Sequence, residues 1–235
     1  MNSENYVGVF RGRKTIQRRG TIGGARSVFV KLQGNKNELV YPTFGGYIKN
    51  PFKGAAKLFA GDLIEYRTDG NGENPEIYIL KTYLVESVSG TTVNIVKDAY
   101  KHTPFVGDRI GVAPDEIGEE MSPVTINSIK ASKVGDVDVW ACTCSATLSA
   151  KKGDVLVEAD EAMDMLVKNI NAVAPTDLDM LDVPATGDED FDGARYSYTP
   201  ALGGIMYINR MSPMPKCVLD LNKSNINGWY QVQSV

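Results

Sequence analysis

The stretch Lys151-Lys152-Gly153-Asp154-Val155-Leu156-Val157-Glu158 joins a turn dipeptide directly to an apolar run. The same pattern occurs at Gly61-Asp62 and at Gly107-Asp108, so the three glycines are separated by two intervals of 46 residues. Glycine adopts positive φ easily and an Asp side chain can bond its own backbone, so each dipeptide predicts a tight turn. The apolar residues that follow predict a short, half-buried strand after each turn. Equal spacing favours related β units, although a chance match of three dipeptides is the alternative because little else repeats at this interval.

The segments between these turns share one order. After a Gly-Asp strand come a loop, an outgoing strand, a turn with Gly90 or Gly135, a returning strand and the next Gly-Asp. Short strands with regular turn signals are typical of a β-barrel or β-sandwich. The sequence therefore predicts a mainly β fold of small antiparallel barrel or sandwich units, with an extended N-terminal arm and one short helix.

The short helix is predicted to begin at Asp160 and to end before Pro175. Its apolar face would hold Met163, Leu166, Val167, Ile170 and Val173. The later segments Val218–Leu221 and Trp229–Val232 are predicted to be strands. The predicted organisation is an arm over residues 1–27, a β-rich body over 28–159, and a helix with a C-terminal β segment over 160–235.

Charge is divided unevenly along the chain. Residues 1–60 hold eleven Lys or Arg and only two acidic residues, a net charge of +9, whereas the whole chain carries −4 and residues 61–235 therefore −13. Basic and apolar residues alternate in the arm, which favours docking on a negatively charged partner over a free, solvated tail. The residues predicted to make this contact are Phe10, Arg11, Arg13, Lys14, Arg18 and Arg19. The acidic body argues against nucleic acid as the partner, so another protein is expected.

Few residues suggest chemistry. The single histidine, His102, lies in a loop where we expect it to be solvated, and no catalytic constellation is evident. Asp188, Asp190 and Asp192 precede Gly193 with the spacing that opens a calcium loop. The closing position is occupied by Thr199 instead of a bidentate Glu, so an ordinary acidic loop is the competing interpretation. No other cofactor is predicted.

The cysteines and the hydropathy indicate where the chain resides. Cys142 and Cys144 would share one face of a strand, where a disulfide is geometrically poor, and with Cys217 they are interpreted as core residues in a reducing compartment. No apolar run reaches the length of a membrane span, and the N-terminus lacks the apolar core of a signal peptide. We therefore expect a protein that is made and kept on the cytoplasmic side, unless another system exports it or lysis releases it, and that makes no membrane contact.

Two stretches resemble virion proteins of tailed bacteriophages, in particular the capsid-associated head auxiliary or head-fibre proteins of crAss-like phages. They are residues 151–159 and the tail that runs from Tyr207-Ile208-Asn209-Arg210-Met211-Ser212-Pro213-Met214-Pro215 to Gly228-Trp229-Tyr230. The resemblance is best over the last third of the chain. It implies a non-enzymatic component of the phage head, present in several copies, which binds the major capsid protein and other virion proteins. The expected location is the virion capsid, after assembly in the host cytoplasm.

The sequence thus favours a virion structural protein whose arm lies along the capsid while its body decorates or cements it. One alternative is a carbohydrate- or receptor-binding β module on the particle surface, which an exposed cluster of Trp and Tyr would favour. Another is a wall-degrading hydrolase, which would need paired carboxylates in a deep pocket.

Overall fold

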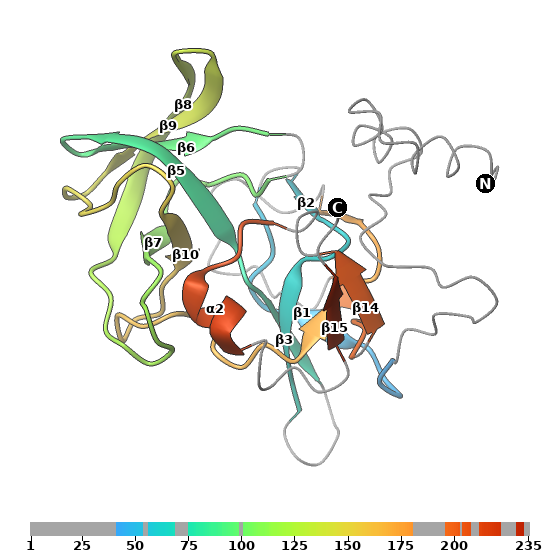
Figure 1. Cartoon of the computed structure of the whole chain (residues 1–235). Helices are drawn as coiled ribbons and strands as arrows, with labels where there is room; N and C mark the ends of the chain where they lie inside the picture. Colours follow the sequence, from blue (N-terminus) through green and yellow to red (C-terminus); the bar gives the residue numbers. More distant parts are fainter. Residues whose placement is uncertain are drawn as a thin grey trace, which may run out of the picture.

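The computed structural model describes residues 41–53, 56–68, 75–98, 101–180, 196–202, 204–207, 212–221 and 229–232. The prediction of a mainly β protein is confirmed, because strands account for most of its regular structure. Figure 1 shows the strands in two main groups, a barrel drawn in green and yellow and a smaller sheet drawn mostly in blue and cyan.

The barrel is closed by six antiparallel strands in the order β10-β5-β6-β9-β8-β7. Their bounds are β5 (Thr82–Ser89), β6 (Thr92–Val96), β7 (Arg109–Val112), β8 (Val124–Val134), β9 (Val137–Cys144) and β10 (Val155–Glu158). The side chains of one buried cluster fill the barrel, and they include Tyr83, Ile95, Ile126 and Leu156. A small barrel of this kind is a packed core and does not enclose a ligand-binding space.

All three Gly-Asp dipeptides form one type of turn. The glycines at 61, 107 and 153 have φ angles of 93°, 89° and 93°. In each turn, the Asp N–H donates to the carbonyl oxygen of the residue three positions earlier, at 3.0, 3.1 and 3.1 Å. The Asp carboxylate accepts the N–H of that same residue, at 2.7, 2.8 and 2.9 Å. The predicted Gly-Asp turns are therefore confirmed.

Each turn also contains the same bulge in the sheet. The glycine N–H donates to the carbonyl oxygen of one residue on the adjacent chain segment, and the N–H of that residue donates to the Asp carbonyl oxygen. The single facing residues are Ala174, Ile126 and Val85 for the first, second and third turns. Two residues facing one, with a glycine at positive φ, is the geometry of a β-bulge. The repeated dipeptide thus marks a repeated structural unit.

The barrel has an internal twofold relation between β5-β6-β7 and β8-β9-β10. Exchanging the two sets maps each pair of neighbouring strands onto another pair of neighbours. In the pairing of β7 with β10, Val112 faces Leu156, Gly111 faces Val157, and Ile110 faces Glu158. Residues 46 positions apart are equivalent in this register, and the Gly111–Val157 pair lies on the axis. The interval of 46 residues between Gly107 and Gly153 therefore joins equivalent positions of the barrel, whereas Gly61 lies outside it.

The second group of strands is a five-stranded sheet in the order β11-β3-β4-β1-β13. The bounds are β1 (Gly46–Ile48), β3 (Leu63–Arg67), β4 (Glu76–Ile79), β11 (Ala172–Val173) and β13 (Ser197–Tyr198). Two two-stranded sheets accompany it, formed by β2 (Ala56–Leu58) with β12 (Leu178–Met180) and by β14 (Gly204–Tyr207) with β15 (Trp229–Val232). The sheet takes strands from both sides of residue 160, the predicted start of the C-terminal segment. The strand at Trp229–Val232 is confirmed.

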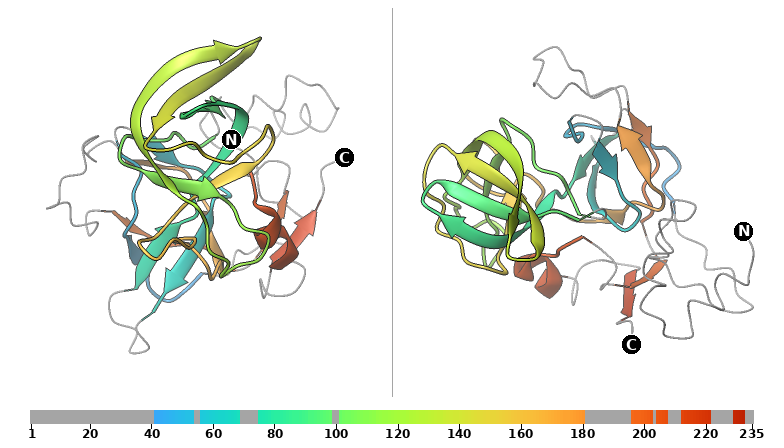
Figure 2. Two further views of the ribbon diagram at one scale, coloured as in Figure 1. Left: turned by 90° about the vertical axis from the view of Figure 1, so that its left-hand side faces the viewer. Right: turned by 90° about the horizontal axis from the view of Figure 1, so that it is seen from above.

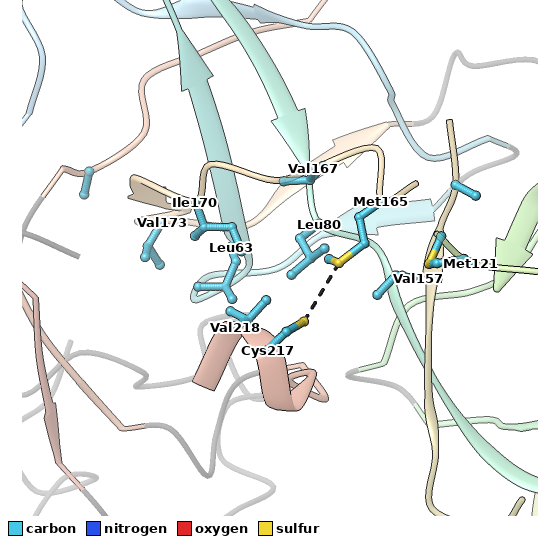
Figure 3. Close-up of a cluster of buried hydrophobic side chains, with 12 residues drawn as sticks. Leu63, Leu80, Met121, Val157, Met165, Val167, Ile170, Val173, Cys217 and Val218 are labelled. Carbon is cyan, nitrogen blue, oxygen red and sulfur yellow. Dashed lines mark hydrogen bonds between the residues drawn. The ribbon is translucent and has the colours of Figure 1, made fainter. Parts of the chain in front are cut away.

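A buried apolar cluster joins the barrel, the sheet and the helix α2 (Lys216–Leu221). Figure 3 shows Leu63 and Leu80 packed against Val218 and Cys217 of α2, with Met165 close to the Cys217 sulfur. The Sγ–Sδ distance between Cys217 and Met165 is 3.9 Å. All three cysteines are free and buried, and burial raises the pKa of Cys142 to about 12. Their interpretation as core residues is confirmed.

The helix predicted after Asp160 is wrong. Met163 has a φ of 62°, in the left-handed region, and the Asp160 carboxylate accepts the N–H of Asp164 in a tight turn. The chain then runs extended along β3, where the Glu65 carboxylate accepts the N–H of Lys168. Met165, Val167, Ile170 and Val173 are nevertheless buried. The backbone can remain extended because β3 bonds groups that a helix would have bonded internally.

The strand predicted over Val218–Leu221 is also wrong, because these residues belong to α2. Pro215 stands immediately before the helix, a position where the missing N–H of proline has no consequence. Cys217 and Val218 lie next to each other in sequence and are both buried. A strand would direct two such neighbours to opposite faces, whereas one face of a helical turn can bury both. The described residues thus contain one short helix, but not where the sequence predicted it.

Candidate functional sites

Polar and charged side chains gather where the five-stranded sheet meets the barrel. Leu80 and Lys81 connect β4 of the sheet to β5 of the barrel. Four more buried polar residues belong to this junction, from segments far apart in the sequence: Asn50, Asp62, His102 and Asp108. Buried polar groups need partners, so the bonds of each group show what it can do.

Asp62, His102 and Ser212 form one set of contacts. The Ser212 hydroxyl donates to Asp62 Oδ1 at 2.6 Å and lies 3.2 Å from His102 Nε2. His102 Nε2 lies 3.0 Å from Asp62 Oδ2, and both side chains are fully buried. The other ring nitrogen, Nδ1, accepts the Thr82 N–H at 2.9 Å. The expectation that His102 is solvated is therefore wrong, because the residue is only 2% exposed.

This trio does not have the arrangement of a catalytic triad. A triad histidine uses one ring nitrogen to take the serine proton and the other to hold the carboxylate. Here the serine and the carboxylate both face Nε2, while the Thr82 N–H occupies Nδ1. Nε2 therefore carries the hydrogen and donates it to Asp62, and neither nitrogen can accept the proton of Ser212. The three side chains act as a crosslink between the first Gly-Asp turn, the loop before β7 and the segment before α2.

A second set of contacts consists of Lys81, Glu158 and Asn50. Lys81 Nζ lies 3.1 Å from Glu158 Oε1, and Asn50 Nδ2 donates to Glu158 Oε2 at 2.9 Å. The Asn50 amide also bonds both backbone groups of Ile79, donating to the carbonyl oxygen at 2.8 Å and accepting the N–H at 2.7 Å. One carboxylate thus holds a buried amine and a buried amide.

Asp108 completes the junction from the second Gly-Asp turn. Its carboxylate accepts the Phe105 N–H at 2.8 Å and the Tyr83 hydroxyl at 3.3 Å, and Lys53 Nζ lies 3.8 Å away. Burial raises the pKa of Asp108; the charge of Lys81 opposes this shift and that of Glu158 adds to it. Burial also raises the pKa of Tyr83 well above its ordinary value, with the Asp108 charge contributing. The phenol therefore stays protonated and serves as a donor.

A small cavity lies beside Ser212. Its volume is about 10 Å³, and it is lined by Gly61, Leu63, Leu80, Thr82, Ser212 and Pro213. The Thr82 hydroxyl oxygen is the one buried side-chain polar atom without a hydrogen-bond partner among the described residues. Pockets for organic ligands have volumes of roughly 300–1,000 Å³. The cavity could therefore hold a solvent molecule but not an organic substrate.

A surface feature stands apart from this junction. The hairpin of β8 and β9 projects beyond the rest of the barrel, as Figures 1 and 2 show. Beyond its pairing with β7, β8 is bonded at Ile126 by the second Gly-Asp turn, and the segment of β6 and Lys97 accompanies β9 only as far as Asp138. In the described part of the chain, β8 from Asn127 to Val134 is paired on one side only, with β9. Most side chains on this segment of β8 are exposed.

The residues predicted from the sequence to bind partners are not placed by the structure. The arm residues Phe10, Arg11, Arg13, Lys14, Arg18 and Arg19 lie outside the described residues, as do Asp188, Asp190 and Asp192 of the candidate calcium loop. Within the described ranges, no group of three or more His, Cys, Asp or Glu side chains could hold a metal ion. In the same ranges, no helix has the length and apolar character needed to cross a membrane.

Sequence reasoning missed Asn50, Lys81 and Glu158. One signal was available, because Lys81 is the one charged residue in the run from Ile77 to Val85, where Thr82 is the only other residue that is neither apolar nor aromatic. A charged residue in such a run predicts a buried charge that needs a partner. The partners themselves come from distant positions and carry no local signature. In comparisons of the whole chain with known proteins, no family model, no curated protein and no solved structure matches it.

Proposed function

We propose that this chain is a structural protein of a tailed-phage virion, which binds the major capsid protein as a head auxiliary or decoration component. The observation that carries the binding role is the open edge of the projecting β8–β9 hairpin. A strand edge presents unpaired N–H and C=O groups, and pairing with an extended segment of another protein satisfies them. The resemblance of residues 151–159 and of the C-terminal tail to phage head proteins supplies the class of partner.

The buried groups agree with a binding role. The barrel interior is filled by apolar side chains, and the carboxylates of Asp62, Asp108 and Glu158 are bonded to neighbouring backbone and side-chain groups. Their bonds connect segments of the sheet and the barrel, which favours a rigid body. A rigid body with a projecting edge suits attachment to a lattice of identical capsid subunits.

A specific observation also favours the second candidate, a carbohydrate- or receptor-binding module. Three aromatic side chains close together in sequence are exposed, namely Tyr41, Phe44 and Tyr47, with exposed fractions of 50%, 65% and 40%. Exposed aromatic rings are one means by which proteins bind the apolar faces of sugars. The two candidates therefore use different surfaces, β8–β9 for the capsid and the segment around β1 for a glycan.

The capsid proposal can be tested by co-sedimentation with empty capsids assembled from the major capsid protein of the same phage. We expect the wild-type chain to sediment with the capsids and to bind less as salt concentration rises, because exposed ion pairs are screened over about 8 Å at physiological ionic strength. Failure of the wild-type chain to bind would overturn the proposal. Binding to a glycan array instead, abolished by Tyr47→Ala, would establish the second candidate.

Two variants locate the contact. Deleting Lys133, Val134, Val137 and Asp138 removes two facing pairs from the hairpin tip and preserves both the Gly135-Asp136 turn and the register. Reversing Arg11, Arg13, Arg18 and Arg19 to Glu tests the predicted arm. Each variant should keep the wild-type circular dichroism and thermal transition. Reduced sedimentation of the shortened hairpin assigns the contact to β8–β9, and reduced sedimentation of the reversed variant assigns it to the arm.

A further inference from the structure

Lys81, Glu158 and Asn50 have the composition and contacts needed for a covalent reaction. The Lys81 amine and the Asn50 amide are bound to the two oxygens of one carboxylate, at 3.1 and 2.9 Å. Lys81 is 3% exposed and Asn50 is 9% exposed, while the Glu158 side chain is 17% exposed. A nucleophile, a base and an acyl group are thus held together away from water.

The hydrogen bonds of Asn50 identify the oxygen and the nitrogen of its side-chain amide. The Ile79 N–H can only donate and the Ile79 carbonyl oxygen can only accept, so Oδ1 faces the former and Nδ2 faces the latter. The Ile79 N–H therefore polarises the amide carbonyl of Asn50 and would stabilise negative charge that develops on Oδ1. The second hydrogen of Nδ2 points to Glu158, the group that can protonate a leaving nitrogen.

The surroundings of the amine are aromatic. Lys81 Nζ lies 5.5 Å from the centre of the Phe52 ring, and Phe52 in turn packs against His102 with ring centres 4.9 Å apart. Phe52 is 1% exposed. The Phe52 ring makes a cation–π contact with the ammonium, and Glu158 is the adjacent group that can accept its proton. An ion pair placed here only for stability would gain little, since desolvation offsets much of its attraction.

We propose that Lys81 and Asn50 form an intramolecular isopeptide bond, with Glu158 as the acid and base. Glu158 takes a proton from the Lys81 ammonium, and the neutral Nζ attacks Cγ of Asn50. Glu158 protonates Nδ2 of the tetrahedral intermediate, the Cγ–Nδ2 bond breaks, and ammonia leaves. The nitrogen that is now bonded to Cγ gives its extra proton to the departing ammonia through Glu158. The products are a secondary amide and an ammonium ion, so charge and atoms balance, and no oxidant or cofactor is required.

The fold brings the reacting groups together, and the bond would join two parts of the structure. Both reacting groups contact one carboxylate, and a pair that moves from there into reacting geometry has an effective concentration of roughly 10⁵–10⁸ M, which would allow a slow amide exchange to proceed. The bond would join the end of β1 to the connection between β4 and β5. It would therefore tie the small sheet to the barrel at the point where the chain passes from one to the other. This inference goes beyond the proposed function and holds whichever partner the protein binds.

The test is the intact mass of the purified full-length chain, measured under denaturing conditions. We expect a mass lower than that of the sequence by one ammonia molecule. Trypsin cleaves after Lys49, Lys53, Arg67 and Lys97, and it cannot cleave at an acylated Lys81. The digest should therefore contain a branched peptide in which residues 50–53 are joined to residues 68–97. The branched peptide also distinguishes the crosslink from loss of ammonia at Asn-Gly sequences elsewhere in the chain.

Variants separate the roles of the three residues. Lys81→Arg keeps a cation beside Glu158 but has no nucleophilic amine, so it should show the full sequence mass. Glu158→Gln should do the same while retaining the contact to Asn50. Asn50→Asp should lose water instead of ammonia and give the same crosslinked product. Lys57→Arg, in the ion pair with Asp179, is the matched control and should still lose ammonia. A full-mass wild-type chain with separate peptides 50–53 and 68–81 would overturn the proposal, whatever the variants do.

Discussion

The three Gly-Asp turns allow one hydrogen bond to be tested in two environments. At Asp154 the carboxylate accepts a single N–H, that of Lys151, in an exposed turn. Replacing Asp154 with Ala removes this bond and leaves the donor to water, so the free energy of unfolding should fall by about 0.5–1.5 kcal/mol. At Asp62 the equivalent carboxylate accepts from Phe59, and it also contacts Ser212 and His102 in the core.

Asp62→Ala removes the acceptor of the partly buried Phe59 N–H and Ser212 hydroxyl and of the buried His102 ring, and each unsatisfied buried group costs about 1–3 kcal/mol. Allowing for non-additivity, we expect a loss of about 3–6 kcal/mol, a large part of a typical stability of roughly 5–15 kcal/mol. Urea unfolding followed by tryptophan fluorescence measures both variants. Asp62→Asn is the control, because its amide oxygen can still accept from Phe59 and His102 while its nitrogen donates to the Ser212 hydroxyl. If Asp62→Ala lost no more than Asp154→Ala, the buried cluster would not stabilise the fold as argued here.

Three further predictions concern charged groups. Burial raises the pKa of Asp108 above its ordinary value of 3.8, so the protonated carboxyl stabilises the folded state and this stabilisation is lost as pH rises through the pKa of the folded state. The Asp108→Asn variant does not titrate at this position. Its stability relative to wild type, from urea titrations between about pH 4 and pH 7, should therefore increase with pH. Burial also acts to raise the pKa of Glu65, but hydrogen bonds from Arg67 and two backbone N–H groups outweigh it and the pKa is lowered. The stabilisation by the Glu65 carboxylate is present above the pKa of the unfolded state and is lost as pH falls through the pKa of the folded state. Glu65→Gln should therefore be less stable than wild type at pH 7, and the two free energies of unfolding should converge in acid. A difference independent of pH would contradict this. A calcium site at residues 188–193 would increase the free energy of unfolding by about 2.7 kcal/mol at a hundredfold excess of the ion over Kd and so raise the melting temperature, and Asp190→Asn would abolish the gain. Since Thr199 supplies no closing carboxylate, we expect calcium and chelator to give the same melting curve.

The features that could be predicted from the sequence are those formed by neighbouring residues. A Gly-Asp turn is complete within four residues, because the bonds of Asp62 to Phe59 need no other segment. The hairpin turns at Gly90 and Gly135 are equally local, and both glycines have a φ of 57°. Buried and exposed side chains alternate along the adjoining strands, because one face of each strand lines the barrel interior.

The predictions that proved wrong concern residues whose structure depends on segments far away in the sequence. The apolar residues from Met163 to Val173 fit a helical period, yet β3 supplies the bonds that hold this stretch extended. His102 is buried because the first Gly-Asp turn and Ser212 enclose it, and these lie far from it in sequence. The reacting set inferred at Asn50, Lys81 and Glu158 joins three strand ends in the same way. Such contacts are properties of the topology, which local patterns do not encode.

Some features of the barrel obey its twofold relation, and others depart from it. The second and third Gly-Asp turns and their bulges repeat, and the pairing of β7 with β10, which lies on the axis, closes the barrel. Two departures stand out. Gly90 follows Val85 by five residues whereas Gly135 follows Ile126 by nine, which makes β8–β9 the hairpin that projects. Glu158 stands where the repeat has Val112, and this one exchange brings a carboxylate to Lys81 and Asn50. Because a barrel needs neither the longer hairpin nor a buried carboxylate at its seam, these two positions are where the chain departs from what its fold requires, and they coincide with the proposed binding edge and the proposed crosslink.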